Sequence, residues 1–335
     1  TMPAPDSLQP TTMTTTTAPG RSPLGRIGAL LAENTAYVAL VLLALVGSTI
    51  ANFASAGNVS SILYQYSVIG LLAFGQLIVV LTSGIDLAQG SMVALGSVVL
   101  GLLVPGAGVG GAAVIAVLMI ALFGMISGLL VAFTDLPPFI VTLGMLGIAS
   151  GLALTLADAK PVIISDSLIS DIGSTVVAGI FPIGAVFWII LGVVLSIFLG
   201  RHKVGRYFYA IGGTAEGSRI SGVPVRFTTV LAYTISGLCA GIAAILYAGN
   251  LGIGNPTGGA GYELEAIAAV LIGGASLAGG HGRIGTTAAG VLVLGCISSI
   301  LDLSGVPQFW QGTIKGIVLL LAVVLGQIKL LRSAR

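Results

Sequence analysis

Long uninterrupted apolar runs alternate along the chain with short polar connections. We predict membrane segments at about residues 36–54, 66–82, 88–104, 111–133, 138–157, 179–200, 228–249, 263–278, 284–303 and 309–328. A helix needs about 20 apolar residues to cross the hydrocarbon core of a bilayer, and most of these runs approach that length. The third and eighth runs are short and contain glycine, which predicts helices that do not cross fully. We therefore expect an all-α, polytopic membrane bundle of about ten segments.

The composition supports a membrane protein. Of 335 residues, 56% are hydrophobic and only 7% are charged, and the mean hydropathy is +1.10. A soluble domain carries about 25% charged residues, so this composition excludes a soluble enzyme, a disordered protein and a nucleic-acid-binding protein. The 50 glycines favour close helix packing or broken helices. Cys239 and Cys296 lie in apolar runs and are interpreted as small buried residues rather than as a disulfide or metal pair.

Two parts are expected along the chain. Residues 1–28 are rich in Thr, Pro and Ser and predict a disordered cytoplasmic tail, whereas residues 29–330 form the transmembrane domain. The first apolar run is followed by Ala54-Ser55-Ala56, which also resembles a signal-peptide cleavage site. We expect an uncleaved first span, because the distribution of charge agrees with ten segments.

Basic residues predict the orientation. With the N-terminus in the cytoplasm, eleven of the thirteen Lys and Arg residues fall on cytoplasmic segments, and both termini lie inside. These eleven are Arg21, Arg26, Arg201, Lys203, Arg206, Arg219, Arg226, Arg283, Lys329, Arg332 and Arg335. The predicted outer loop 158–178 holds three Asp residues against Lys160.

An internal repeat divides the chain into two pseudo-repeated halves. The segment V-L-T-S-G-I-D-L-A-Q-G at 80–90 aligns with V-L-I-G-G-A-S-L-A-G-G at 270–280, with six of eleven positions identical. In each copy an apolar run is broken at glycine and then resumes. Paired interrupted helices in two halves indicate a transport pathway, and the repeat leaves the cargo open.

Several ionisable residues fall within the predicted membrane region. Asp86 is either a substrate contact or, with Gln89 three residues later, a helix N-cap with a reciprocal partner; the cap is the favoured interpretation. Glu263 and Glu265 suit the first turn of a helix. Lys315 lies inside the last run, where it either extends toward the membrane surface or pairs with Asp302.

The cytoplasmic loop 201–228 predicts a separate short helix. Thr214 can cap it, Glu216 suits its first turn and Arg219 its last, Gly222 can end it in a left-handed conformation, and Pro224 prevents its continuation. A helix of about two turns presented to the cytoplasm suits docking to a soluble partner, although an ordinary surface helix fits the same pattern.

Catalytic and nucleotide-binding motifs are missing from the sequence. Residues 106–111 fit G-x-G-x-x-G without a βαβ context, and 280–287 fit the Walker A spacing with Thr286 at the lysine position. Two His residues cannot build a His-rich metal cluster, and nothing resembles a nucleophilic triad. We therefore predict a non-enzyme without a metal site or cofactor of its own. Active transport would need an ATP-hydrolysing partner or an ion gradient.

Four motifs are spaced along the chain. They are S-G-I-D-L-A-Q-G-S at 83–91, P-P-F-I-V-T-L-G at 137–144, G-R-Y-F-Y-A-I-G-G at 205–213 with R-I-S-G-V at 219–223, and G-Y-E-L-E-A-I-A-A at 261–269 with I-G-G-A-S-L-A-G-G at 272–280. Together they resemble the motifs of monosaccharide ABC importer permeases of the ribose, xylose and galactose type. Two departures stand out. Thr214, Gly217 and Ser218 replace the usual Asn and paired Ala, and Ala88-Gln89 replaces Ser-Val.

The resemblance implies a transport subunit in the bacterial plasma (inner) membrane. A two-domain ATPase would bind ATP and Mg²⁺ on the cytoplasmic side, and an extracytoplasmic sugar-binding protein would deliver a monosaccharide or related polyol. A second permease, the same chain or a related one, would complete the path, with lipid around it and no nucleic acid. The implied coupling residues are Thr214, Glu216, Gly217, Ser218, Arg219, Ile220, Ser221 and Gly222, and the hypothetical path residues are Thr82, Asp86, Gln89, Ser91 and Ser276. Most sugar recognition is expected in the binding protein.

Three alternatives remain at this point. The branched-chain amino-acid branch of the same superfamily is the nearest, and the I-D-L-x-x-G-S segment favours sugar over it. An ion-gradient-driven secondary transporter would use Asp86, Glu265 or Lys315 as ion-coupling groups. A membrane-embedded enzyme is the third, and it lacks a catalytic constellation.

Overall fold

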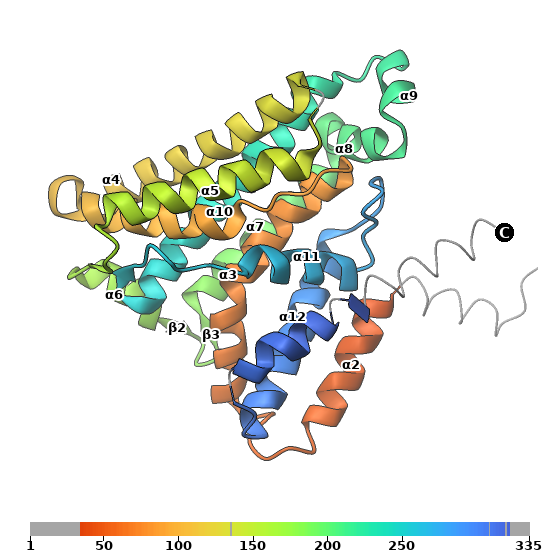
Figure 1. Ribbon diagram of the computed structural model, residues 1–335. Coiled ribbons are helices and arrows are strands. Elements are labelled where there is room, and N and C mark those ends of the chain that lie inside the picture. Colours follow the sequence, from red (N-terminus) through yellow and green to blue (C-terminus); the bar gives the residue numbers. More distant parts are fainter. Residues whose placement is uncertain (1–33, 135, 308, 319, 322–335) are drawn as a thin grey trace, which may run out of the picture. The chain divides into compact units, whose positions relative to one another are not determined.

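The computed structural model describes residues 34–134, 136–307, 309–318 and 320–321 (Figure 1). The predicted tail 1–28 and the basic residues Lys329, Arg332 and Arg335 lie outside this part of the chain. The elements in order are α2 (Thr35–Gly47), α3 (Ala56–Leu81), α4 (Gln89–Phe133), α5 (Pro138–Leu156), β1 (Val162–Ile163), α6 (Ser167–Ser174), β2 (Val176–Val177), β3 (Phe181–Pro182), α7 (Ile183–Arg201), α8 (Lys203–Gly213), α9 (Ala215–Ile220), α10 (Val225–Leu251), β4 (Ile253–Gly254), α11 (Tyr262–Ile272) and α12 (Ile284–Leu303). Residues 309–318 are also helical.

Six described helices are long and apolar enough to cross a membrane: α3, α4, α5, α7, α10 and α12. This agrees with an all-α membrane bundle. The first predicted segment, 36–54, is shorter than expected, because α2 has 13 residues and ends at Gly47. The Ser48 and Thr49 hydroxyls donate to the carbonyls of Leu45 and Val46, and turns follow the helix.

Helix α4 contains the third and fourth predicted segments. Gly108 has φ 66° and ψ 168°, so the helical path stops there. Figure 1 shows the chain turning back between the two halves of α4, so α4 is two helices joined by a tight reversal. A Cβ at Gly96 would lie 3.1 Å from Ile120 Cγ1, so the two halves pack directly against each other.

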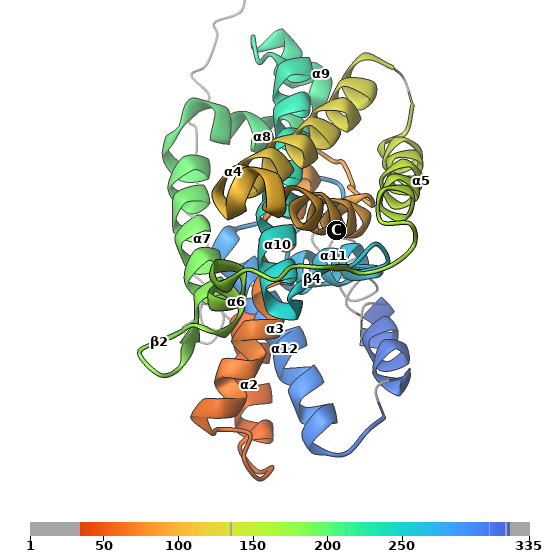
Figure 2. The ribbon, with the colours of Figure 1, turned by 90° about the vertical axis from the view of Figure 1, so that its left-hand side faces the viewer.

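Helices α3 and α10 occupy the interior, while α5 and α7 lie at the periphery (Figures 1 and 2). The second half of α4 meets α10 through two G-x-x-x-G motifs, Gly124 to Gly128 and Gly237 to Gly241. A Cβ at Gly237 would lie 2.6 Å from the Ile120 carbonyl oxygen, and one at Gly124 would lie 3.0 Å from Gly237 Cα. Such small residues let helix backbones approach closely, and dispersion contacts then hold the pair. The high glycine content is thus used partly for close packing.

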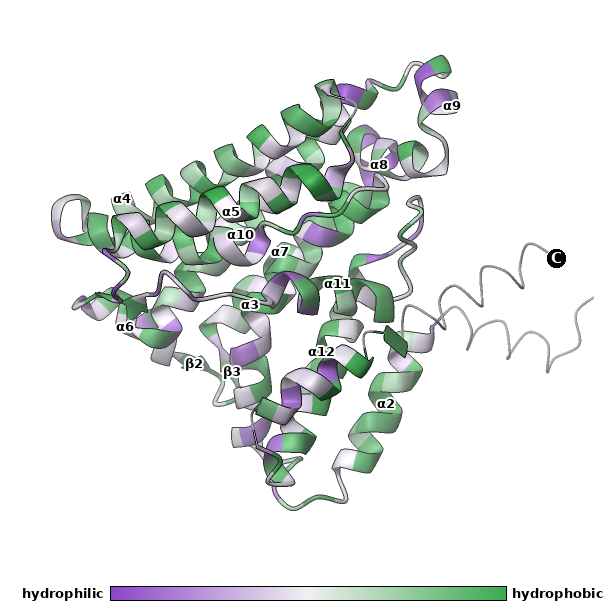
Figure 3. Ribbon diagram, in the orientation of Figure 1, coloured by the Kyte–Doolittle hydropathy of each residue, from purple (hydrophilic) through white to green (hydrophobic). Residues whose placement is uncertain are grey.

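Apolar side chains cover the outside of the peripheral helices. Figure 3 shows α4, α5 and α7 largely hydrophobic, with polar positions gathered on α8 and α9. Exposed leucine, isoleucine, valine and phenylalanine side chains line α4, α5 and α7, as a lipid-facing surface requires. Two short antiparallel pairs, β1 with β4 and β2 with β3, are the only described strands and join the ends of helices.

Candidate functional site

The two copies of the internal repeat are both interrupted helices. The first break separates α3 from α4, and the second separates α11 from α12. Each preceding helix ends in the same hydrogen-bonded turn: Gly84 N–H donates to Val79 O and Ala275 N–H donates to Val270 O, both at 3.1 Å. The left-handed residues of the turns are Ser83, with φ 61°, and Gly274, with φ 81°. The two turns therefore match when Ser83 is paired with Gly274, one residue away from the pairing in the sequence alignment.

The two breaks lie side by side. Gly280 N–H donates to the Leu81 carbonyl at 3.0 Å, and Ser83 Oγ donates to the Ala278 carbonyl at 2.8 Å. Segments about 195 residues apart are thus joined by direct hydrogen bonds. Backbone groups that no longer pair within a helix are satisfied by the other break, as the interior of a membrane protein demands.

Asp86 lies at the centre of a fully buried polar network. Its Oδ1 accepts from Ala88 N–H at 3.0 Å, and its Oδ2 accepts from Ser236 Oγ of α10 at 2.7 Å. Gln89 Nε2 donates both to Ser236 Oγ at 2.8 Å and to the Leu72 carbonyl of α3 at 3.1 Å. The Asp86, Gln89 and Ser236 side chains are all 0% exposed. The network fastens the break between α3 and α4 onto both central helices.

This geometry corrects the predicted capping arrangement. Helix α4 begins at Gln89 with Ala88 at the N-cap position, so Asp86 lies before the cap and bonds Ala88 N–H instead. Gln89 does not reach back to the Asp86 backbone. Gln76 of α3 makes these backbone hydrogen bonds instead. Its side-chain amide, oriented to suit its partners, donates to Asp86 O at 3.0 Å and accepts from Asp86 N–H at 3.2 Å. Gln76 and Ser236 could not be found from the local sequence pattern, because they lie on α3 and α10.

The other predicted path residues are partly exposed and bond locally. Thr82 Oγ1 donates to the Val79 carbonyl and Ser91 Oγ to the Ala88 carbonyl, both at 2.8 Å. Ser276 Oγ accepts from Ala278 N–H within the second break at 3.2 Å. Of the five predicted path residues, Thr82, Ser91 and Ser276 are thus partly exposed, whereas the two in the Asp86 network are sealed.

The predicted short helix of the loop 201–228 is α9. Thr214 Oγ1 accepts from Gly217 N–H at 3.0 Å as its N-cap, and Gly222 follows its end with φ 81°. Glu216 and Arg219 form an exposed pair at 3.5 Å. Ile220 is 80% exposed, which is unusual for a large apolar residue on a helix that is too short and polar to enter the membrane. The remaining predicted residues, Ser218 and Ser221, lie at the buried face and the exposed C-cap of α9.

Helix α8, which lies in the same loop, contacts both breaks. Tyr209 Oη donates to the Gly282 carbonyl at 3.1 Å, and a Cβ at Gly212 would collide with both Gly280 N and Leu81 O. Burial raises the pKa of the Tyr209 phenol, and nearby Arg283 opposes this more weakly. The phenol therefore stays protonated and remains a donor.

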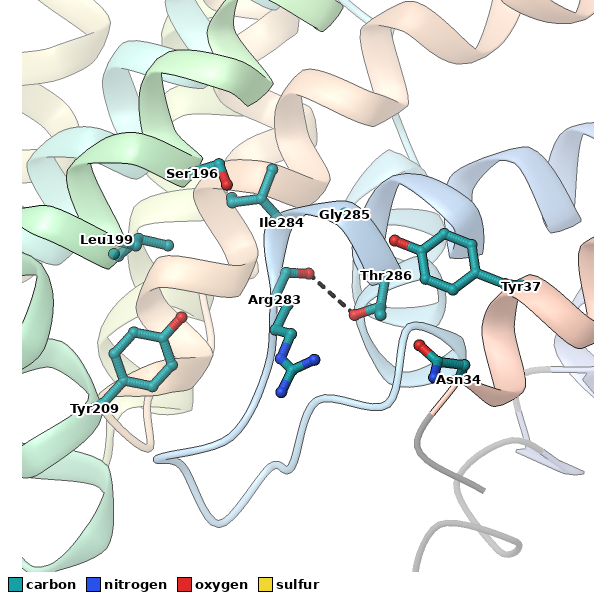
Figure 4. A pocket seen from close by; sticks show the side chains of 10 residues that line it. Asn34, Tyr37, Ser196, Leu199, Tyr209, Arg283, Ile284, Gly285 and Thr286 are labelled. Carbon is teal, nitrogen blue, oxygen red and sulfur yellow. Dashed lines mark hydrogen bonds between the residues drawn. The ribbon is translucent and has the colours of Figure 1, made fainter. Parts of the chain in front are cut away.

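A pocket of about 350 Å³ lies beside this contact (Figure 4). The side chains of Tyr37, Tyr209 and Arg283 surround it, and Thr286 Oγ1 donates to the Arg283 carbonyl at 3.1 Å. Residues of α2, α8 and the start of α12 therefore line the same pocket. The complete lining is Asn34, Tyr37, Ser196, Leu199, Gly200, Tyr209, Arg283, Ile284, Gly285 and Thr286.

A groove of about 720 Å³ lies next to α9, between the end of α4 and the start of α10. Apolar side chains including Leu129 and Phe227 line it together with Arg219 and Arg226. The Arg226 guanidinium lies 5.1 Å from the centroid of the Phe133 ring, which is a cation–π distance. Apolar and cationic surface is thus continuous with α9.

The acidic residues of α11 have different partners. Glu263 and Glu265 both lie in its first turn as predicted, and Glu263 Oε1 accepts from Gly261 N–H at 3.2 Å. Lys315 pairs with Glu265 at 2.9 Å, a partner that differs from Asp302 and from the membrane surface, the two alternatives left open by the sequence. Asp302 instead accepts from Gln311 Nε2 at 2.7 Å. The described residues contain no group of three or more His, Cys, Asp or Glu side chains suited to a metal ion.

The sequence was compared with protein families, with individual known proteins and with solved structures. Residues 58–323 match the family described as the permease component of the branched-chain amino acid transport system. The ribose import permease protein of Escherichia coli (strain K12) is 37% identical over 323 residues, covering 93% of this chain and 98% of the relative. The ribose import permease protein of Bacillus subtilis (strain 168) is 37% identical, covering 81% and 85%. The D-allose transport system permease protein of Escherichia coli (strain K12) is 34% identical, covering 88% and 91%. No solved structure matches the chain.

Proposed function

Because the chain belongs to the family of permease components of the branched-chain amino acid transport type, we propose that it is the membrane-spanning subunit of an ATP-driven importer for a monosaccharide or related polyol. The observation that carries the proposal is the near full-length similarity to ribose and allose import permeases. The family description itself names the alternative cargo, a branched-chain amino acid.

We propose ten membrane segments in two pseudo-repeated halves, in the bacterial inner membrane and with both termini in the cytoplasm. The two halves of α4 count as separate segments, α2 and the helical residues 309–318 begin the first and last, and the short helix α11 together with the break that follows it makes the eighth. The distribution of basic residues supports this orientation.

We propose that α9 docks into a groove on a two-domain ATPase. Its exposed Ile220 offers an apolar anchor, and the adjoining groove with Arg219 and Arg226 extends the surface. The Thr214 cap stabilises a six-residue helix that contains the weak helix former Gly217. ATP and Mg²⁺ would bind the ATPase, and this chain would carry no cofactor.

The contacts of α8 suggest how ATPase movement reaches the membrane. Tyr209 bonds the second break, and that break bonds the first. A displacement of the loop 201–228 would therefore act on both interrupted helices at once. ATP-driven closure of the ATPase would bias the permease between inward-open and outward-open states.

The translocation path is proposed to run between this chain and a second permease, a copy of itself or a related subunit. Thr82, Ser91 and Ser276 would line the path, whereas Asp86 and Gln89 would hold the first break in position from inside the chain. An extracytoplasmic sugar-binding protein would deliver the cargo.

Affinity purification of the tagged permease from native membranes tests the proposal. A two-domain ATPase and an extracytoplasmic binding protein are expected to co-purify. Ile220→Glu should lose the ATPase, whereas Ile163→Glu, which alters an equally exposed isoleucine in β1, should retain it. The co-purified binding protein is then screened for ribose, allose and fructose against leucine, isoleucine and valine.

Two results would contradict the proposal. Binding of leucine rather than a sugar would identify the amino-acid alternative. A complex that survives mild detergent without an ATPase, together with uptake abolished by a protonophore, would identify a gradient-driven transporter.

A further inference from the structure

An ion pair joins α11 to the last described helical residues. Lys315 Nζ lies 2.9 Å from Glu265 Oε1, and the two side chains are 23% and 21% exposed. The other two ion pairs of the described residues lie in loops or on α9, with side chains at least 67% exposed. Both members of the pair have apolar neighbours in sequence, within predicted membrane segments. Ionisable residues within membrane segments almost always face the protein interior or a water-filled path.

Two tyrosine side chains, Tyr66 and Tyr262, lie close to the pair, and a third packs against Tyr262. Lys315 Nζ lies 5.7 Å from the centroid of the Tyr66 ring in α3, and Tyr66 Oη shares a 2.5 Å hydrogen bond with Ser298 Oγ of α12. Tyr262, at the start of α11, packs edge-on against Tyr247 of α10 with ring centroids 6.1 Å apart. Aromatic faces combined with a few fixed polar groups are the usual composition of a small-molecule site.

The pair retains unused hydrogen-bonding capacity. Glu265 Oε2 is buried without a hydrogen-bond partner among the described residues. Lys315 has three N–H donors, of which the structure shows one used on Glu265. A buried acceptor without a partner is costly, so a ligand hydroxyl that donates to Glu265 Oε2 would be favoured. Neutral polyols suit this site, because each hydroxyl both donates and accepts.

We propose that Glu265, Lys315 and the ring of Tyr262 form a contact site for cargo hydroxyl groups inside the membrane. Hydroxyls would donate to the Glu265 carboxylate and accept from the Lys315 ammonium, and a C–H face of the cargo would lie on Tyr262. The contact is transient, since Glu265 and Lys315 remain paired with each other when no cargo is bound. This inference rests on the proposed import of a sugar. None of the three residues belongs to the path predicted from the sequence, although Tyr262 and Glu265 lie on α11, whose end belongs to the second copy of the repeat.

The test uses the whole importer, with its ATPase and binding protein, in proteoliposomes. Uptake of labelled ribose, allose and fructose is measured together with ATP hydrolysis for the wild type, Glu265→Gln, Lys315→Met and the double variant. Glu263→Gln is the matched control, because it lies in the same helical turn and keeps an oxygen that accepts from Gly261 N–H. Removing both charges together leaves neither one buried and unpaired, so the double variant guards against misfolding.

Loss of cargo contacts should lower sugar uptake without lowering ATP hydrolysis. Both single variants and the double variant are expected to lose about tenfold in sugar uptake, the effect of one charged hydrogen bond. Binding-protein-stimulated ATP hydrolysis should stay near the wild-type rate, and Glu263→Gln should match the wild type in both.

The proposal is overturned if the double variant restores uptake that the single variants lose, because the pair is then a structural link only. It is also overturned if uptake and ATP hydrolysis fall in parallel, or if neither falls. A wild-type complex that assembles but takes up none of the three sugars contradicts the proposed function instead.

Discussion

The buried carboxylate of Asp86 shows how one residue can hold a broken helix. It has no cationic partner among the described residues, and its two oxygens are satisfied by one backbone N–H and by the Ser236 hydroxyl. An isolated polar group inside a membrane protein is tolerated only when it is fully hydrogen-bonded. The conformation of the first break therefore depends on the side chain of Asp86.

Asp86→Ala is expected to lower the melting temperature of the purified permease in detergent. The substitution leaves Ala88 N–H and the Ser236 hydroxyl without their acceptor, at a cost of about 1–3 kcal/mol for each buried unsatisfied group. Asp86→Asn keeps an acceptor oxygen and should fall between the alanine variant and the wild type.

Asp171→Ala is the control, because this aspartate is exposed on the helix α6 and has an ordinary helical backbone conformation. If Asp86→Ala and Asp171→Ala both melt at the wild-type temperature, the network does not stabilise the fold.

At the scale of elements, the contact between α4 and α10 depends on the absence of side chains. Gly124 and Gly237 bring the two backbones together, whereas Gly144 of α5 has open space where its Cβ would lie. Both kinds of glycine occur in apolar helices, and only their surroundings differ.

Gly237→Ala should therefore destabilise the permease, and Gly144→Ala should not. The new methyl group at position 237 would lie 2.6 Å from the Ile120 carbonyl oxygen, so the helices must separate. Overpacking of this kind costs about 1–3 kcal/mol. At Gly144 the better helix propensity of alanine, worth up to about 1 kcal/mol, acts alone.

Thermal melting of the two variants in the same detergent measures the difference. Equal melting temperatures would show that the α4–α10 backbones are not in close contact.

At the scale of the whole molecule, the arrangement of charges predicts which side of the membrane each loop faces. Lys160 lies on the predicted outer loop, and Arg219 lies on α9 in the predicted cytoplasmic loop. Both side chains are well exposed, at 77% and 67%. The two native cysteines, Cys239 and Cys296, are free and buried.

These features allow a direct test of orientation by cysteine labelling. In intact cells whose outer membrane is permeabilised, a membrane-impermeant maleimide should label Lys160→Cys at once. Arg219→Cys should be labelled only after the inner membrane is opened, and the native cysteines should give a low background. The reverse pattern would invert the proposed topology.

The helices, the two breaks and the helix α9 could be predicted from the sequence, because each depends on residues that are close together in the chain. Apolar run length, capping by Thr214 and the left-handed Gly222 all act within a few residues, so a linear pattern records them. Near full-length family similarity is also a property of the sequence.

Only the tertiary structure decided which helices meet. Lys315 pairs with Glu265, 50 positions away, rather than with nearby Asp302, and Gln89 finds Ser236 147 positions away instead of turning back to Asp86. Apolar periodicity cannot reveal such partners in a membrane protein, because lipid-facing and protein-facing surfaces are equally apolar. Close packing and the pairing of rare polar groups distinguish those surfaces, and both exist only once the helices are assembled.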